Sequence, residues 1–336
     1  MDVLLIVASN DEPRATARAN ELYASAKTAG LVHTYRETAR RIEDREHFGF
    51  RDGISQPRIV GYDADGVLGP GHFVFGYSKH AGSAPFSPVV DPRGLTDNGS
   101  LLVFRRLAQN VSNFHAYLTE ELAKISADWP RLTLEHLAAL LVGRWPSGAP
   151  VKAGQTQDPG GSPPDNTFDF HEDTNAQSCP FGAHIRKVNP RSGPKDVVEV
   201  PRILRRGIPF GPTFDSRPDE TDRGLCFLAF QSSIKEKFEF LTQHWMNSVL
   251  NPARGNDLLV GRSDDVRSMT INGPNGPIQV SAPELQWIVP TGGAYLFAPS
   301  RSGLAKFGTP PAPLRMWKLQ HLWARASDTV KASLFE

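Results

Sequence analysis

One stretch of the chain, residues 179–211, gathers groups that could bind a metal and an anion in the same place. It contains a single imidazole, His184, with cations around it at Arg186, Lys187, Arg191, Arg205 and Arg206. A neutral imidazole is the commonest protein ligand for a metal, and guanidinium groups bind carboxylates through paired hydrogen bonds. An iron porphyrin that carries carboxylates would use both. A lone histidine also fits an ordinary structural role, so a second stretch must decide.

That second stretch is HFGFRDGISQPRI at residues 47–59, which places Asp52 between Gly49 and Gly53. Glycines let the backbone adopt unusual angles and approach other groups closely, which suits a carboxylate that acts as an acid or base. A plain Asp-Gly turn explains the same residues without any catalytic role. Both interpretations stay open at this point.

Length and composition indicate a soluble globular protein whose partners are small molecules. The chain has 336 residues, with 39% hydrophobic and 22% charged content. Its 37 basic and 36 acidic residues leave no broad charge that would favour nucleic acid or a membrane surface. No apolar run is long enough to span a bilayer and no export signal follows Met1, so a cytoplasmic location is the default. We expect Cys179 and Cys226 to be reduced packing residues, with a single disulfide as the alternative.

The pattern of apolar and polar residues predicts an α+β protein in which strands and helices follow one another in two similar series. The expected strands are Asp2–Ser9, Gly71–Tyr77, Ser100–Leu107, Gly224–Gln231 and two around Thr291-Gly292-Gly293. The expected helices are Glu12–Ala29, Val111–Ala127, Thr133–Val142, residues 232–247 with Ile234, Phe238, Leu241 and Trp245 on one face, and a last one from about Ser300. Residues 146–178 read as a long loop. The Gly- and Pro-rich stretch at 79–98 marks a boundary between domains at residues 1–97 and 98–336.

Three motifs, in this order, resemble the dye-decolorizing peroxidase family. They are GFRDG at Gly49–Gly53, AHIRKVNPR at Ala183–Arg191 and ILRRGIPFG at Ile203–Gly211. The segments GSLLVFRRLAQN, GLCFLAFQSSI and PTGGAYLFAPS are also similar to that family's core, so the resemblance covers nearly the whole chain. Gly207 stands where the shorter bacterial branch usually has Asn, which makes the longer fungal and bacterial branch the better match.

The resemblance implies two ferredoxin-like domains in a dimeric α+β barrel-like arrangement and one haem b, or iron protoporphyrin IX, in the C-terminal domain. It assigns roles to eight residues: Asp52 as distal acid, His184 as iron ligand, Arg191 as partner of a haem propionate, Arg205 as distal arginine, Leu225 and Phe227 as distal pocket walls, Trp245 as surface electron relay and Asp257 as the carboxylate bonded to the other nitrogen of His184. It also implies about a hundred residues ahead of Asp2, roughly a small domain's length, so that the N-terminal domain would be incomplete.

The implied activity is that of a haem peroxidase, which uses hydrogen peroxide to oxidise dyes and phenols through a ferryl intermediate. Asp52 would move the peroxide proton and Arg205 would polarise the O–O bond. Because an aspartate ordinarily has a pKa of about 4, we expect an acidic optimum.

Other interpretations stay open. A haem-binding or storage protein without turnover would need His184 and Arg191 but not the distal pair. A haem-free remnant could instead bind a partner through exposed sheet edges. Trp245 also fits an ordinary core role. The physiological reductant and the oligomeric state are not predicted.

Overall fold

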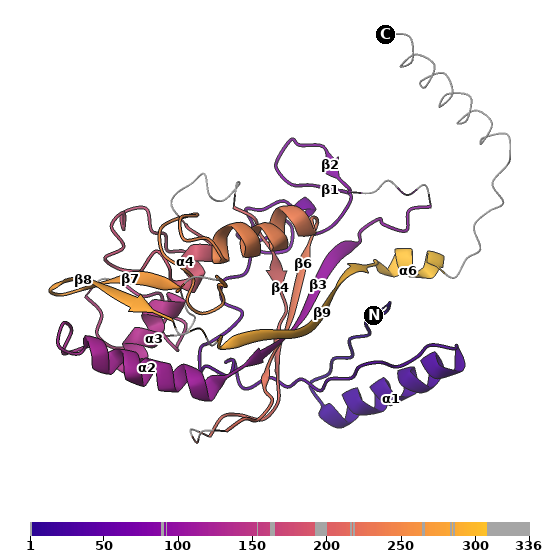
Figure 1. Cartoon of the computed structure of the whole chain (residues 1–336). Helices are drawn as coiled ribbons and strands as arrows, with labels where there is room; N and C mark the ends of the chain where they lie inside the picture. The colour runs from indigo at the N-terminus through magenta and orange to yellow at the C-terminus, as the bar shows by residue number, and fades with distance from the viewer. Residues whose placement is uncertain are drawn as a thin grey trace, which may run out of the picture.

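An antiparallel sheet with helices beside it forms the centre of the molecule (Figure 1). The computed structural model describes residues 2–88, 91, 93–152, 154–161, 165–191, 200–215, 217, 219–263, 266–282, 284 and 286–307. Its strands are β1 Tyr77–Ser78, β2 Pro85–Phe86, β3 Ser100–Gln109, β4 Leu204–Arg205, β5 Ile208–Phe210, β6 Gly224–Gln231, β7 Ser268–Gly273, β8 Gly276–Ser281 and β9 Ile288–Ala298. Its helices, with η for 3-10 and π forms, are α1 Glu12–Thr28, η1 Pro70–His72, α2 Val111–Ile125, α3 Leu134–Val142, α4 His184–Val188, η2 Ile234–Glu239, η3 Leu241–Met246 and α6 Arg301–Phe307. The predicted α+β class is confirmed, while the division into two domains stays a prediction.

The central sheet has the order β4-β6-β3-β9, and β5 also pairs with β6. Every pairing in it is antiparallel, and Val103 in the middle of β3 lies between Ala229 and Tyr295. The strands predicted over β3 and β6 are confirmed. The prediction of two strands around Thr291 is wrong, because β9 runs through as one strand. Its register against β3 shifts at Thr291, so the chain absorbs the extra residue as a bulge instead of ending the strand.

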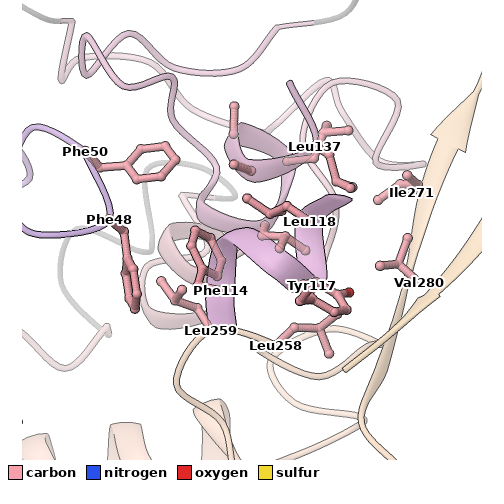
Figure 2. Packing of buried hydrophobic residues seen from close by; sticks show 14 of the residues in the cluster. Phe48, Phe50, Phe114, Tyr117, Leu118, Leu137, Leu258, Leu259, Ile271 and Val280 are labelled. Carbon is pink, nitrogen blue, oxygen red and sulfur yellow. The ribbon is translucent and has the colours of Figure 1, made fainter. Parts of the chain in front are cut away.

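The largest core cluster lies between α2, α3 and the hairpin β7–β8 (Figure 2). Phe114 and Leu118 of α2 pack there with Leu137 of α3. The cluster also holds pairs from two loops, which are Phe48 with Phe50 and Leu258 with Leu259. The first pair precedes Asp52 and the second follows Asp257, so one core anchors both loops that carry candidate site residues.

The N-terminal segment is held much less firmly. α1 forms as predicted, with the Asp11 carboxylate accepting from the Arg14 N–H at 2.8 Å, but none of its residues is buried. The strand predicted at Asp2–Ser9 is wrong, because these residues form no regular structure and pair with none of the described strands. Val3 is 56% exposed, whereas Leu4 packs against the second core cluster at the sheet. A branched apolar run becomes a strand only where a neighbour takes its backbone hydrogen bonds.

Two further elements differ from expectation. The strand predicted at Gly71–Tyr77 is wrong, because its backbone bonds locally through η1 and following turns, as when the Phe73 N–H donates to the Pro70 carbonyl at 2.9 Å. The helix at 232–247 forms, but in the wider π form, so it buries Lys237 and Leu241 and leaves Trp245 half-buried. The period of an α-helix therefore predicted the burial of Leu241 correctly but missed that of Lys237.

The remaining predictions concern loops, termini and cysteines. The described part of 146–178 contains no helix or strand, as expected, and α6 begins where the last helix was predicted. Residues of that helix beyond 307 lie outside the described residues. The hairpin β7–β8 was not predicted. Cys179 and Cys226 are both buried free thiols, and no described helix is both long and apolar enough to cross a membrane.

Candidate functional site

A cavity of about 920 Å³ opens between α4, the loop after Phe50, and the central sheet. Six of the eight side chains singled out from the sequence line it: Asp52, His184, Arg191, Arg205, Leu225 and Phe227. The alternation of β6 explains the last two, since Leu225 and Phe227 face the cavity while Cys226 and Leu228 pack in the second core cluster. Segments far apart in the sequence thus meet around one space.

A buried carboxylate backs the imidazole. The Nδ1 of His184, the first residue of α4, lies 2.7 Å from Oδ2 of Asp257, the contact that we expected. The other oxygen of Asp257 accepts from the backbone N–H groups of Leu259 and Val260 at 3.0 and 3.1 Å. A carboxylate only accepts, so Nδ1 carries the proton and Nε2 keeps its lone pair. We call His184 and Asp257 the proximal pair.

A glycine brings the two halves of the proximal pair together. A Cβ built on Gly182 would lie 2.5 Å from the carbonyl oxygen of Asn256 and 2.7 Å from Cβ of Met269. Any larger residue at 182 would therefore push the start of α4 away from the loop that carries Asp257. The close approach of these two backbones sets the 2.7 Å contact.

The second charged pair is more open. Nη1 of Arg205, on β4, donates to Oδ1 of Asp52 at 3.1 Å, and Nη2 donates to the Ser55 carbonyl at 3.4 Å. The side chains of Asp52 and Arg205 are 32% and 31% exposed. Gly49 and Gly53 on either side of Asp52 have φ of 95° and 80°, as the sequence led us to expect of a presented carboxylate. We call Asp52 and Arg205 the distal pair.

The loop that presents Asp52 is tied down by Glu46, which the sequence did not single out. Its carboxylate accepts from the N–H groups of Phe48 and Phe50 at 2.9 and 3.0 Å and from the Gln109 side chain at 2.6 Å. Burial raises the pKa of Glu46. Nothing in its spacing distinguished Glu46 from the surrounding charged residues; only the fold brings it to β3.

A cationic wall forms another part of the cavity. Arg191 donates to the carbonyls of Asn166 and Phe168 at 2.9 and 3.0 Å and to the Asn166 side chain at 2.6 Å. Beside it lies Arg144, which is 4% exposed and was not singled out from the sequence because it falls outside the three motifs. Burial is the main cause that lowers the pKa of each guanidinium to about 10. Among the described residues, neither is in an ion pair with a carboxylate.

Trp245 lies apart from the cavity. It is half-buried on η3, with its ring 5.5 Å from that of Phe240, while Leu241, Thr242 and Met246 of the same helix line the cavity. Trp245 therefore faces away from the wall that its own helix builds.

Comparisons with known proteins place this chain in a family. Residues 94–259 match the family model described as Dyp-type peroxidase, C-terminal. The structure of an ancestral D-type dye-decolorizing peroxidase superposes with a TM-score of 0.75 at 32% identity, and the match covers 91% of this chain and 73% of that one. The chain belongs to the dye-decolorizing peroxidase family.

Other members of the family are similar to this chain over most of its length. The chain is 33% identical to dye-decolorizing peroxidase msp1 of Mycetinis scorodonius over 78% of its own length, and 33% identical to the multifunctional dye peroxidase DyP2 of an Amycolatopsis species over 76%. It spans only 56% and 59% of the length of these two relatives. A dye-decolorizing peroxidase solved in complex with 2,6-dimethoxyphenol superposes with a TM-score of 0.71 at 29% identity, covering 88% of this chain and 72% of that one.

Proposed function

We propose that this protein is a haem peroxidase, which uses hydrogen peroxide to oxidise dyes and phenols. The observation that carries the proposal is that one cavity is lined both by an imidazole backed by a buried carboxylate and by an Asp–Arg pair. Membership of the dye-decolorizing peroxidase family supports the reaction, and the relative solved with 2,6-dimethoxyphenol supports phenols as a substrate class.

The described residues fit a haem. A cavity of about 920 Å³ lies at the upper end of the usual range for cofactor sites. His184 would bind the iron through Nε2, because Nδ1 is already committed to Asp257. Arg191 would bind a propionate, because neither cation of this wall is in an ion pair with a carboxylate among the described residues. When bound, the haem would supply the iron that accepts the peroxide and takes up its oxidising equivalents.

The distal pair would manage the proton. In the described part of the chain, Asp52 accepts hydrogen bonds from Arg205 and from the Gly53 N–H, and both bonds go to Oδ1. Oδ2 is therefore the oxygen that would take the proton from the inner oxygen of the peroxide and return it to the outer one, which leaves as water. Arg205 cannot serve as the base, since a guanidinium keeps its charge. It would instead stabilise the negative charge that develops on the leaving oxygen.

The other residues would orient the imidazole, exclude water or carry electrons. Asp257 accepts from Nδ1 of His184, so it holds the ring in place and raises the basicity of Nε2. Leu225 and Phe227 would keep water from the space beside the distal pair. Trp245, on the outer side of η3, would pass electrons from substrates too bulky to enter the cavity.

A titration with hemin tests the proposal. Hemin added to the purified chain should give a Soret band. Rapid mixing with hydrogen peroxide should then change that band. His184→Ala should lose the band. A band that peroxide does not alter would indicate a haem carrier, and the absence of any band from the natural chain would exclude the proposed function.

A further inference from the structure

Arg144 is a buried cation whose charge has no partner of opposite sign in the described part of the chain. It lies two residues after the end of α3, and its Nη1 donates to the carbonyls of Gly148 and Asp165 at 2.6 and 2.8 Å. Nη2 donates to Ser55 Oγ at 3.0 Å and to Asn166 Oδ1 at 3.1 Å. All four acceptors are neutral, and the buried Nε has no partner among the described residues. Burying an uncompensated charge is costly unless an anion joins it.

A second guanidinium shares those partners. Arg191 also donates to Asn166 Oδ1, at 2.6 Å, and lies 3.5 Å from Ser55 Oγ. The ring of Phe168 lies 5.0 Å from the guanidinium carbon of Arg144 and 4.3 Å from that of Arg191. Arg144 is the largest cause after burial of the lowered pKa of Arg191, with Arg202 next. The fold therefore holds two like charges together at a cavity wall, an arrangement that an anion would stabilise.

We propose that Arg144 and Arg191 together form a subsite for the carboxylates of the tetrapyrrole, with Arg144 as a determinant of selectivity for a porphyrin that bears free carboxylates. The inference rests on the proposed function, which requires a haem but assigns a carboxylate partner only to Arg191. Both guanidiniums line the cavity and remain charged near neutral pH, since each pKa lies at about 10.

The subsite is also joined to the distal pair. Ser55 accepts from Arg144 through its hydroxyl oxygen and from Arg205 through its carbonyl oxygen, at 3.0 and 3.4 Å. Ser55 lies three residues after Asp52 in the same loop. An anion seated between Arg144 and Arg191 would thus settle the loop that presents Asp52, so that binding the cofactor and aligning the acid are coupled.

The experiment compares two ligands that differ only in their carboxylates. Hemin and hemin dimethyl ester are titrated, in the same dilute detergent, into the natural chain and into Arg144→Gln, with the Soret band as the readout. We expect Arg144→Gln to weaken the binding of hemin by about tenfold or more, because it removes one of the two positive charges beside the carboxylates, and to weaken the binding of the ester by less than about twofold. Arg131→Gln, which removes an exposed cation that does not line the cavity, should change neither.

The outcomes separate the inference from the proposed function. Equal losses of both ligands in Arg144→Gln would mean that Arg144 only supports the wall, and unchanged hemin affinity would mean that it contributes nothing; either overturns the inference. If the natural chain binds neither ligand, the proposed function itself fails. Should Arg144→Gln not fold, as judged by circular dichroism, Arg144→Met, which also removes the charge, takes its place: a reduced preference for hemin over the ester supports the inference, and an unchanged preference overturns it.

Discussion

The proximal and distal pairs line one cavity but are held in opposite ways. Asp257 is fully buried and takes part in three hydrogen bonds, so the imidazole it backs has a single orientation. Asp52 is 32% exposed, and its contact with Arg205 is 3.1 Å long. A group that must bind a metal gains from rigidity, whereas a group that must exchange protons with an incoming molecule needs access to it. The contrast therefore separates a holding side, where the proximal pair would bind the iron, from a reacting side, where the distal pair would exchange protons.

The scaffold does not cause this difference, since one core anchors both loops. Phe48 and Phe50 ahead of Asp52 pack in the same cluster as Leu258 and Leu259 after Asp257 (Figure 2). The two loops diverge only beyond these anchors. Asp257 turns back into the protein, whereas Asp52 follows Gly49 and precedes Gly53, whose positive φ angles carry it towards the cavity. Substitutions at the pairs should therefore separate binding from reaction while the core stays intact.

The largest effect is expected at the distal acid. Asp52→Asn keeps an oxygen for Arg205 but cannot carry a proton, so the reaction with peroxide should slow by about 10²- to 10⁴-fold while hemin affinity stays unchanged. Stopped-flow absorbance at the Soret band measures the rate, and an equilibrium titration measures the affinity. Asp128→Asn, which changes an exposed carboxylate that does not line the cavity, serves as control. A variant that reacts at the natural rate would remove Asp52 from the mechanism.

The proximal carboxylate should show the reverse behaviour. In Asp257→Asn, an amide N–H facing Nδ1 of His184 would force the ring proton onto Nε2 and so remove the lone pair that binds iron. We expect hemin affinity to fall by about 10- to 100-fold, as for other changes behind a metal-binding histidine. A Soret titration measures it. If hemin affinity survives and only the peroxide rate falls, the division between a holding side and a reacting side is wrong.

A change at Lys237, the buried lysine of η2, should affect stability and leave the proximal and distal pairs unchanged. The Nζ of Lys237 lies 3.2 Å from Nδ1 of His72 and donates to the Arg202 carbonyl, also at 3.2 Å. Burial lowers the pKa of Lys237 from 10.5 to about 7, with Lys79 and Arg202 adding to the effect and Glu236 opposing it. The unfolded chain thus binds this proton more tightly than the folded chain between about pH 7 and pH 10.5, so stability should rise with pH through that window.

Lys237→Met removes that dependence. The stability of the natural chain relative to the variant should increase by on the order of 3 kcal/mol from about pH 7 to about pH 10. Urea unfolding at a series of pH values measures the difference, and Lys235→Met, an exposed lysine on the same helix, should follow the natural chain. Parallel profiles for Lys237→Met and the natural chain would show that the buried lysine has an ordinary pKa. Hemin affinity should not change, because Lys237 does not line the cavity.

Much of the candidate site could be predicted from the sequence because its residues lie in short motifs whose chemistry is local. His184, Arg191 and Arg205 stand within one stretch of the chain, and Asp52 lies between glycines that take positive φ. Their meeting at a single cavity required the fold. Glu46 and Arg144 could not be predicted, because their importance comes from burial and from partners distant in the sequence, such as Gln109 and Ser55.

The prediction of secondary structure failed where pairing with a distant segment decides whether a strand forms. DVLLIVAS at residues 2–9 and GLCFLAFQ at 224–231 have similar apolar patterns, but only the second is a strand, because β3 takes up its backbone hydrogen bonds. The sequence around Thr291 predicted a break between two strands, but Thr291 is instead a bulge in β9 that its pairing with β3 accommodates. The helix over η2 and η3 was predicted with the period of an α-helix, and its wider turns moved Trp245 to the outer side.

That displacement bears on the smallest predicted effect. A tryptophan buried as core would matter for stability, whereas one that faces outward from a cavity wall can meet substrates that the cavity excludes. Trp245→Phe should therefore lower turnover of bulky dyes by about two- to tenfold, roughly 0.4–1.4 kcal/mol, and leave turnover of small phenols unchanged. Trp129→Phe replaces another half-buried tryptophan that does not line the cavity, and it should affect neither substrate class. Equal losses for dyes and phenols in Trp245→Phe would indicate a weakened proximal wall, since η3 packs against α4 behind His184. Only a loss confined to dyes would show that electrons from bulky substrates enter through Trp245, on the side of the proximal pair, while protons move at the distal pair.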